Sequence, residues 1–130
     1  MPIRVLIVDD ELAVCINIAA FLEDEGMQVE TAATAELALA LAADLAKFDV
    51  CIMDMRLPGI DGNQAIQAIH QLAPQLPFII HTGSTNYALP PELRAIGLSD
   101  GDIFMKPLAD MHILASAIKE RATRAKDRQQ

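Results

Sequence analysis

The chain has 130 residues, 52% of them hydrophobic, and carries a formal net charge of −8 at pH 7. This length gives one domain with a single core, and no apolar run approaches the roughly 20 residues needed to cross a bilayer, which argues against a membrane span. The negative charge argues against direct nucleic-acid binding by this domain, because phosphate contacts need clustered Lys and Arg.

The first expected strand is "IRVLIV" (3–8), a continuous apolar run that ends at Asp9 and Asp10. Because no small-residue cleavage site follows it, we expect a buried strand rather than a signal peptide, and a chain that is not exported. Cys15 and Cys51 lie in apolar periodic segments. They are expected to be buried, reduced thiols of a cytoplasmic protein, with a disulfide as the alternative.

A helix is expected in "ELAVCINIAAFLEDEG" (11–26), with Gly26 as its C-terminal stop. The apolar residues at helical spacing are Leu12, Cys15, Ala19 and Leu22. The next segment, "MQVETA" (27–32), alternates apolar and polar residues, which is typical of an edge strand exposed on one side. "AELALALAADLAKF" (35–48) is rich in Ala and Leu and predicts the second helix.

The third strand is expected in "DVCIMD" (49–54), an apolar run that ends in a carboxylate. In the turn Leu57–Ile60, Pro precedes Gly, which suits type II geometry. The helix "DGNQAIQAIHQL" (61–72) is expected to begin at Asp61, because Gln64 completes a capping-box pattern.

Two further strands are expected in "PFIIHTG" (77–83) and "DIFMKP" (102–107). Between them a fourth helix is expected to begin near Pro91, and the preceding Pro90 is expected to shorten or displace it. The last helix, "DMHILASAIKERATRAK" (110–126), has three apolar residues on one face. These residues are Met111, Leu114 and Ile118.

The one cluster of basic residues in the sequence is at its end, in "KERATRAKDRQQ" (119–130). We interpret this cluster as the solvated face and tail of the last helix; a linker to a further domain is the alternative. The expected organisation is therefore one folded domain over residues 1–124 and a polar tail, or the start of a linker, over residues 125–130.

Strands and helices thus alternate strictly along the sequence. Such alternation predicts an α/β fold in which a parallel sheet carries helices on both faces, joined by right-handed crossovers. In folds of this class, ligands bind beyond the carboxyl ends of the strands, where the strand order reverses.

Polar side chains stand at those ends of four of the predicted strands. The first strand finishes in Asp9 and Asp10, the third in Asp54, the fourth in Thr82 and the fifth in Lys106. Three crowded carboxylates need a compensating cation, and Mg²⁺ is suited because it takes oxygen ligands and keeps positions for water and phosphate. A carboxylate held there could attack phosphorus and form an aspartyl phosphate, with lysine and hydroxyl contacts to the phosphoryl oxygens.

Four segments occur in a set order: "LIVDDE" (6–11), "MDMRLPGIDG" (53–62), "HTGS" (81–84) and "MKP" (105–107). Together they resemble the receiver domain of two-component response regulators, in the single-domain form similar to chemotaxis regulators. This resemblance implies a flavodoxin-like, doubly wound (βα)5 fold with a five-stranded parallel sheet of order 2-1-3-4-5.

The resemblance also implies the roles of the residues at the metal site. Asp54 matches the phosphoacceptor, and Asp9 and Asp10 match the acidic pair that binds Mg²⁺. Asp54 itself and the backbone carbonyl of Arg56 complete the implied metal ligands.

The switching residues match the family with one departure. Thr82 matches the switch hydroxyl, Lys106 the lysine that contacts the phosphoryl group, and Pro107 the family's cis-proline. The family's mobile aromatic residue is replaced here by Ile103, which is stiff and has no ring. Phe104 is expected to point to the opposite face of its strand and into the core.

The resemblance therefore implies a signalling receiver, not a conventional enzyme. It would accept a phosphoryl group from a sensor histidine kinase or a histidine phosphotransfer protein and change its affinity for a downstream protein, with homodimer formation left open. One alternative is a degenerate receiver that acts as a phosphorylation-independent interaction module. Another is a Mg²⁺-dependent phosphohydrolase with an aspartate nucleophile, against which Arg56 counts because such enzymes resemble Asp-x-Asp-x-Thr.

Overall fold

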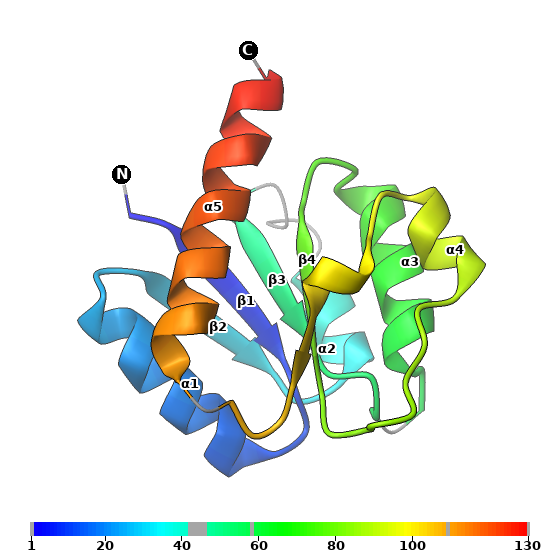
Figure 1. The fold of residues 1–130 in the computed structure, drawn as a ribbon, viewed down its shortest axis with the longest axis horizontal. Coiled ribbons are helices and arrows are strands. Elements are labelled where there is room, and N and C mark those ends of the chain that lie inside the picture. Colours follow the sequence, from blue (N-terminus) through cyan, green and yellow to red (C-terminus); the bar gives the residue numbers. More distant parts are fainter. Residues whose placement is uncertain (1, 42–46, 58, 109, 130) are drawn as a thin grey trace.

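The computed structural model describes residues 2–41, 47–57, 59–108 and 110–129. Its centre is a five-stranded parallel sheet in the order β2-β1-β3-β4-β5 (Figure 1). The strands are β1 (Arg4–Val8), β2 (Gln28–Ala32), β3 (Val50–Met53), β4 (Phe78–Thr82) and β5 (Ile103–Met105). This arrangement confirms the predicted flavodoxin-like fold, with β2 at an edge of the sheet.

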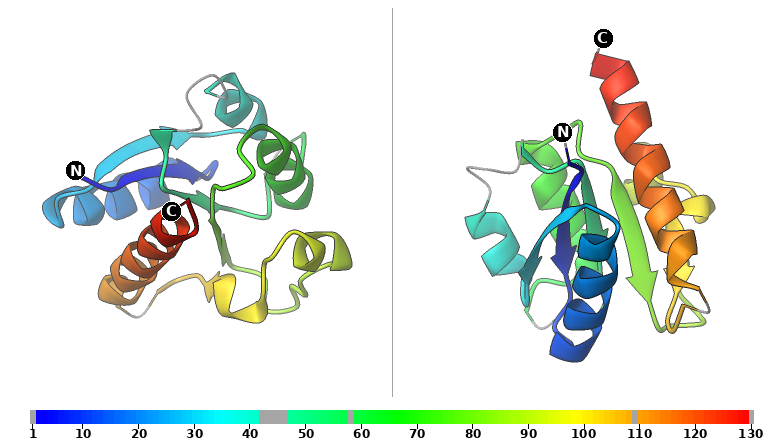
Figure 2. Two further views of the ribbon diagram at one scale, coloured as in Figure 1. Left: turned by 90° about the horizontal axis from the view of Figure 1, so that it is seen from above. Right: turned by 90° about the vertical axis from the view of Figure 1, so that its left-hand side faces the viewer.

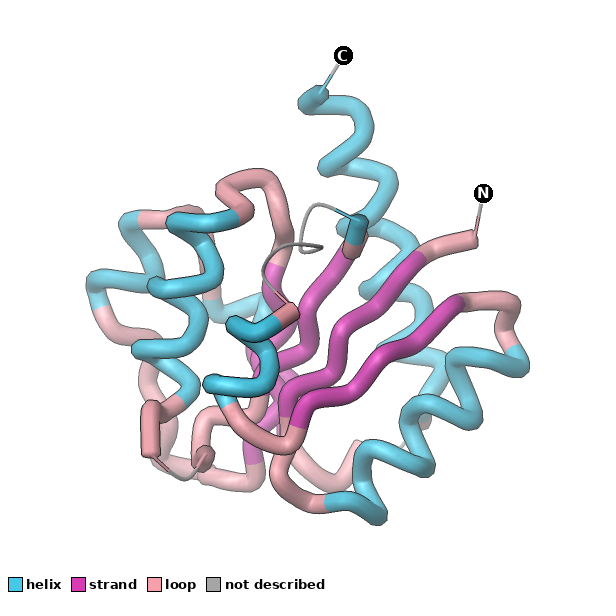
Figure 3. The backbone as a smooth tube through the Cα atoms, turned by 180° about the vertical axis from the view of Figure 1, so that it is seen from behind, coloured by secondary structure: helices cyan, strands magenta, loops and turns pink. Residues whose placement is uncertain are grey.

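Helices cover both faces of the sheet (Figure 2). One face carries α1 (Leu12–Asp24) and α5 (Met111–Gln129), and the other carries α2 (Ala35–Ala40), α3 (Gly62–Leu72) and α4 (Pro91–Ala95). A short 3₁₀ turn, η2 (Asp100–Asp102), leads into β5. Seen from behind, the loops that follow the strands gather at one end of the sheet (Figure 3).

The sheet has a core on each face, not the single core expected from the length, because successive strand residues point to opposite sides. In β1, Val5 and Ile7 pack in the core under α1 and α5, whereas Leu6 and Val8 pack in the core under α2, α3 and α4. All four are at most 1% exposed. This double burial explains why the strand is a continuous apolar run rather than an alternating one.

The predicted apolar stripe of α1 was partly wrong. Its buried residues are Cys15, Ile18 and Leu22, whereas Leu12 is 72% exposed. Leu12 is the first residue of the helix, which begins just past the end of β1, so its side chain has no strand beneath it. Gly26 ends the helix region with a φ of +88°, a left-handed conformation that glycine adopts readily.

Helix boundaries follow local signals. The Asp61 side chain accepts from the Gln64 N–H at 2.9 Å and the Gln64 side chain accepts from the Asp61 N–H at 3.3 Å, which confirms the capping box. The fourth helix begins at Pro91 and has only five residues, as the two prolines predicted.

Two predictions fall partly outside the described residues. The second helix was predicted over 35–48, of which residues 42–46 are not described. The turn predicted at Leu57–Ile60 includes residue 58, which is not described either.

Helix α5 runs to Gln129, so the residues expected to form a tail, 125–129, are helical. The domain boundary at residue 124 stays a prediction.

Cys15 and Cys51 are free and buried, as expected. The Lys106-Pro107 peptide bond is cis. None of the helices in the described part of the chain is both long and apolar enough to cross a bilayer.

Candidate functional site

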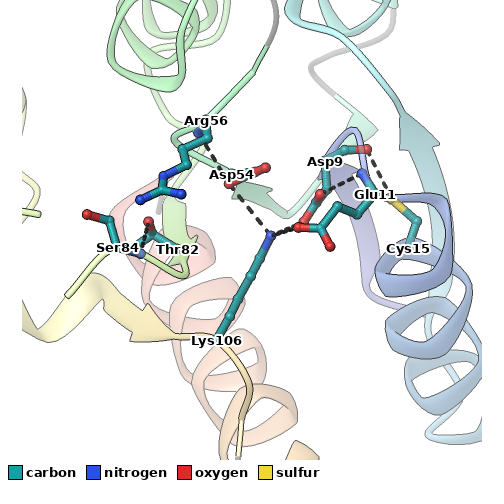
Figure 4. Close-up of polar contacts among 8 residues, drawn as sticks. All are labelled: Asp9, Glu11, Cys15, Asp54, Arg56, Thr82, Ser84 and Lys106. Carbon is teal, nitrogen blue, oxygen red and sulfur yellow. Dashed lines mark hydrogen bonds and ion pairs between the residues drawn. The ribbon is translucent and has the colours of Figure 1, made fainter.

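The candidate site forms where the carboxyl ends of β1, β3 and β5 meet (Figure 4). Val8 lies opposite Met53 in the register of β1 and β3, so Asp9 and Asp54, which follow them, are neighbours. The Asp54 N–H donates to the Val8 carbonyl at 2.8 Å and extends this pairing by one residue. The sequence places carboxylates here because each directly follows a strand that the core holds fixed.

Asp9 is 3% exposed, and its carboxylate accepts hydrogen bonds from two donors. Its Oδ1 accepts from the Glu11 N–H at 2.9 Å, and its Oδ2 accepts from Lys106 Nζ at 2.7 Å. Its backbone carbonyl accepts a weak hydrogen bond from Cys15 Sγ at 3.3 Å. These contacts fix the position of Asp9 between the sheet and the start of α1.

Asp54 is 4% exposed and has weaker partners. Its Oδ1 accepts from the Arg56 N–H at 3.3 Å and lies 3.6 Å from Lys106 Nζ. Burial and the nearby charge of Asp9 raise the pKa of Asp54 to about 6, from an ordinary value of 3.8. Burial and the neighbouring negative charge disfavour the ionised form of Asp54, so any additional cation that binds beside it stabilises that form.

Lys106 is the cation that contacts the carboxylates of the site, and its side chain is only 14% exposed. Its Nζ reaches Asp9 and Asp54, and also lies 3.4 Å from Glu11 Oε1. Burial disfavours the ammonium form, but the hydrogen bond to Asp9 and the surrounding carboxylates outweigh it and raise the pKa of Lys106. The lysine is therefore charged at neutral pH.

Asp9, Asp10 and Asp54 fit a divalent cation. Each can offer one carboxylate oxygen, and these three oxygens lie within 4.8 Å of one another. A pocket of about 260 Å³ opens beside them and is lined by Asp10, Glu11, Asp54, Arg56, Gly83 and Lys106. The four carboxylates of this region outnumber its two cations, Lys106 and Arg56, so net negative charge remains, and an all-oxygen donor set suits a hard ion such as Mg²⁺.

Thr82 is fully buried, and in Figure 4 its hydroxyl is turned toward the loop after β4. Its Oγ1 accepts from the Ser84 N–H at 3.1 Å. The Lys106 N–H donates to the Thr82 carbonyl at 2.8 Å, which ties β5 to β4 at this end. Arg56 lines the pocket, and its N–H contacts Asp54; the metal-ligand role predicted for its carbonyl remains a prediction.

Two contributors to this region were not assigned from the sequence. Glu11 adds a carboxylate beside Lys106, and its position directly after the aspartate pair was the available signal. His81, next to Thr82 in the chain, is 4% exposed, and neither ring nitrogen has a hydrogen-bond partner within the described part of the chain. Burial and the Lys106 charge lower the pKa of His81 to about 4, from an ordinary value of 6.5.

We expect His81→Leu to stabilise the protein. The apolar side chain removes two buried polar atoms without partners, which should raise the free energy of unfolding by about 1–3 kcal/mol at pH 7. As pH falls from 6.5 to 4, the unfolded wild type binds a proton that the folded protein resists, so wild-type stability drops by up to about 3 kcal/mol further relative to the variant. Urea unfolding of both proteins across this pH range checks the expectation. Parallel stability curves would contradict it.

The structure is a parallel doubly wound sheet with an acidic pocket at the carboxyl ends of its strands. The family model described as "Response regulator receiver domain" matches residues 5–118. The chain therefore belongs to the response regulator receiver domain family of two-component signalling, a signalling module rather than a conventional enzyme.

Curated relatives share this region with the chain. It is 31% identical over 121 residues to the alginate biosynthesis transcriptional regulatory protein AlgB of Pseudomonas aeruginosa, covering 93% of this chain and 26% of that protein. It is also 31% identical over 117 residues to the response regulator MprA of Mycolicibacterium vanbaalenii, covering 88% of this chain and 48% of that protein. The chain thus spans less than half the length of these relatives.

Solved structures show the same fold. A CheY-like response regulator receiver domain protein from Methanospirillum hungatei is 30% identical, with a TM-score of 0.80, over 98% of this chain and 99% of that one. NtrX from Brucella abortus, in complex with ADP, is 27% identical with a TM-score of 0.85, over 99% of this chain and 29% of that one.

Proposed function

We propose that this receiver domain accepts a phosphoryl group on Asp54 in a Mg²⁺-dependent reaction and changes its affinity for a partner protein. The observation that carries the proposal is the placement of Asp54. Its buried carboxylate ends a core strand, contacts Lys106 and lines the same pocket as Asp10. A nucleophile held rigidly beside compensating cations is what phosphoryl transfer requires, since that chemistry depends on positioning and charge neutralisation.

In the proposed reaction, an Asp54 carboxylate oxygen forms a bond to the phosphorus of a phosphohistidine. The P–N bond breaks, and its electron pair stays on the donor imidazole. Asp9, Asp10, Asp54 and the Arg56 carbonyl would hold Mg²⁺, which when bound neutralises charge on the phosphoryl oxygens. Lys106 contributes a fixed positive charge to the same oxygens, and Thr82 contributes its hydroxyl once it turns from Ser84.

The proposed phosphoryl donor is a sensor histidine kinase or a histidine phosphotransfer protein. A relative of the chain, named "Sensor histidine kinase GacS" in Pseudomonas protegens, is 33% identical over 122 residues, which cover 13% of that protein. A cytoplasmic location fits the proposal, because both cysteines are unpaired, as is usual in a reducing compartment.

We expect Asp10→Asn to weaken Mg²⁺ binding by at least about tenfold, because it removes one charged oxygen from the proposed ligand set. Asp10 is exposed, so the fold should be unaffected. Titration calorimetry with MgCl₂ on the wild type and the variant measures the change. Asp24→Asn, an exposed carboxylate at the end of α1, serves as the matched control. Equal affinities in all three proteins would refute the metal assignment.

Binding of beryllofluoride, an unreactive analogue of the phosphoryl group, tests the proposed function. We expect saturable binding that requires Mg²⁺ and is lost in Asp54→Asn. A phosphorylation-independent interaction module is the second candidate, favoured by Ile103 at the position of the family's mobile aromatic residue. It predicts that Mg²⁺ binds and beryllofluoride does not.

A further inference from the structure

Ile103 stands where the family has its mobile aromatic residue. A different side chain is therefore needed to couple the phosphorylation site to the rest of the domain. Ile103 lies partly buried against the core under α2, α3 and α4. Tyr87 packs against the same core from the loop between β4 and α4, and it is the only tyrosine of a chain without tryptophan. An aromatic ring is thus present on the loop that follows Thr82.

Tyr87 joins this loop to α3. Its phenol donates to Asn63 Oδ1 at 3.0 Å, and its backbone N–H donates to the Ser84 carbonyl at 3.3 Å. Burial and the Asp61 carboxylate raise the pKa of Tyr87, so the phenol keeps its proton and remains a donor at neutral pH. The loop is therefore held at its middle by a side-chain contact to a different element.

The same loop is held to Thr82 at its start. Because Thr82 Oγ1 accepts from the Ser84 N–H, turning that hydroxyl toward a phosphoryl group on Asp54 removes the acceptor of a backbone donor. A partly buried N–H without an acceptor is costly, which favours movement of Ser84 toward another acceptor. The Ser84 carbonyl, which accepts from Tyr87, moves with it.

The α3 end of the contact is fixed to the phosphorylation site. A Cβ on Gly62 would lie 2.6 Å from the Asp54 carbonyl oxygen and 2.7 Å from Met55 Cα, so only glycine permits this approach. The capping box formed by Asp61 and Gln64 holds the same turn of the helix. Asn63 therefore stays in place when the loop after β4 moves.

We propose that Tyr87 and Asn63 are positioning residues that form a latch of the resting state, released when the Thr82 hydroxyl turns to a phosphoryl group on Asp54. The latch supplies the aromatic coupling that Ile103 does not. This inference rests on the proposed function, because it needs an occupied Asp54.

The single tyrosine makes the latch directly observable. Tyrosine emission and the long-wavelength tyrosine absorption band of the wild type, where phenylalanine does not absorb, report on Tyr87 alone. We expect both to change when Mg²⁺ and beryllofluoride are added together, and not with either alone. Calorimetric binding of beryllofluoride is measured on the same sample, so that occupancy of the site is known independently of the tyrosine signal.

The affinity of the protein for beryllofluoride gives the second readout. Tyr87→Phe keeps the ring and removes the donor, and Asn63→Ala removes the acceptor. Each should tighten beryllofluoride binding by about two- to tenfold, because the resting state loses one hydrogen bond, and the double variant should add little more. Thr123→Ala removes an exposed side-chain hydrogen bond on α5 and should change nothing.

The outcomes separate the two proposals. Binding of beryllofluoride with an unchanged tyrosine signal, or with additive effects of the two substitutions, overturns the latch and leaves the phosphoryl-acceptor function standing. Absence of binding in the wild type overturns both. If Tyr87→Phe does not fold, Asn63→Ala and the wild-type emission still decide the question.

Discussion

Replacing Asp54 with asparagine is expected to raise the free energy of unfolding of the metal-free protein by about 2 kcal/mol at neutral pH. The folded-state pKa of about 6 lies above the ordinary 3.8, so ionisation of this carboxylate costs the folded state free energy. That cost is absent below about pH 4, grows as pH rises toward 6 and is complete above it. The stabilisation by Asp54→Asn should follow the same course, measured by urea unfolding in EDTA.

Asp24→Asn is the matched control for Asp54→Asn, because it makes the same chemical change at an exposed site. It should shift stability by no more than about 0.5 kcal/mol. Saturating Mg²⁺ should reverse the order, since the bound cation stabilises the wild type more than the variant. If Asp54→Asn instead lowers the free energy of unfolding at neutral pH without metal, ionisation of Asp54 does not destabilise the folded state, and the account is contradicted.

Lys106→Met should have the opposite effect. It leaves Asp9 and Asp54 buried without the cation that contacts both, which is expected to lower the free energy of unfolding by about 3 kcal/mol at pH 8 without metal. The loss should shrink at pH 5, because Asp54, with a pKa of about 6 in the wild type, is then largely protonated. Added Mg²⁺ should raise the melting temperature of this variant more than that of the wild type.

Lys119→Met, an exposed substitution on α5, controls for the loss of a lysine and should change stability by no more than about 0.5 kcal/mol. The pH dependence separates charge from packing in Lys106→Met. If the variant loses equal stability at pH 5 and pH 8, and Mg²⁺ restores none of it, the lysine acts through its aliphatic stem rather than its ammonium group.

Much of the fold was predictable because its signals are local. Doubly buried strands such as β1 and β3 are continuous apolar runs, and the Asp61 capping box lies within four consecutive residues. The polar residues that directly follow such strands must lie at one edge of a parallel sheet, so the sequence predicts that Asp9 and Asp54 lie together, as they do. The order of the strands came from the resemblance to the family.

What the sequence did not show depends on tertiary contacts. Nothing local indicates that Leu12 lies beyond the sheet, or that His81 is buried without a partner in the described residues. The contact between Tyr87 and Asn63 joins residues 24 positions apart on different elements, and only the packing of α3 against the β4–α4 loop creates it. The contacts between elements are therefore the part of this domain where the structure adds most to the sequence.

The first measurement is the intact mass of the protein after incubation with a small phosphodonor and Mg²⁺, beside an EDTA control and Asp54→Asn. We expect the mass to increase by one phosphoryl group only in the wild type with Mg²⁺, and peptide mapping to place the group on Asp54. If the wild type gains no mass from small donors or from purified phosphorylated histidine kinases, although Mg²⁺ is bound, the domain is not a phosphoryl acceptor.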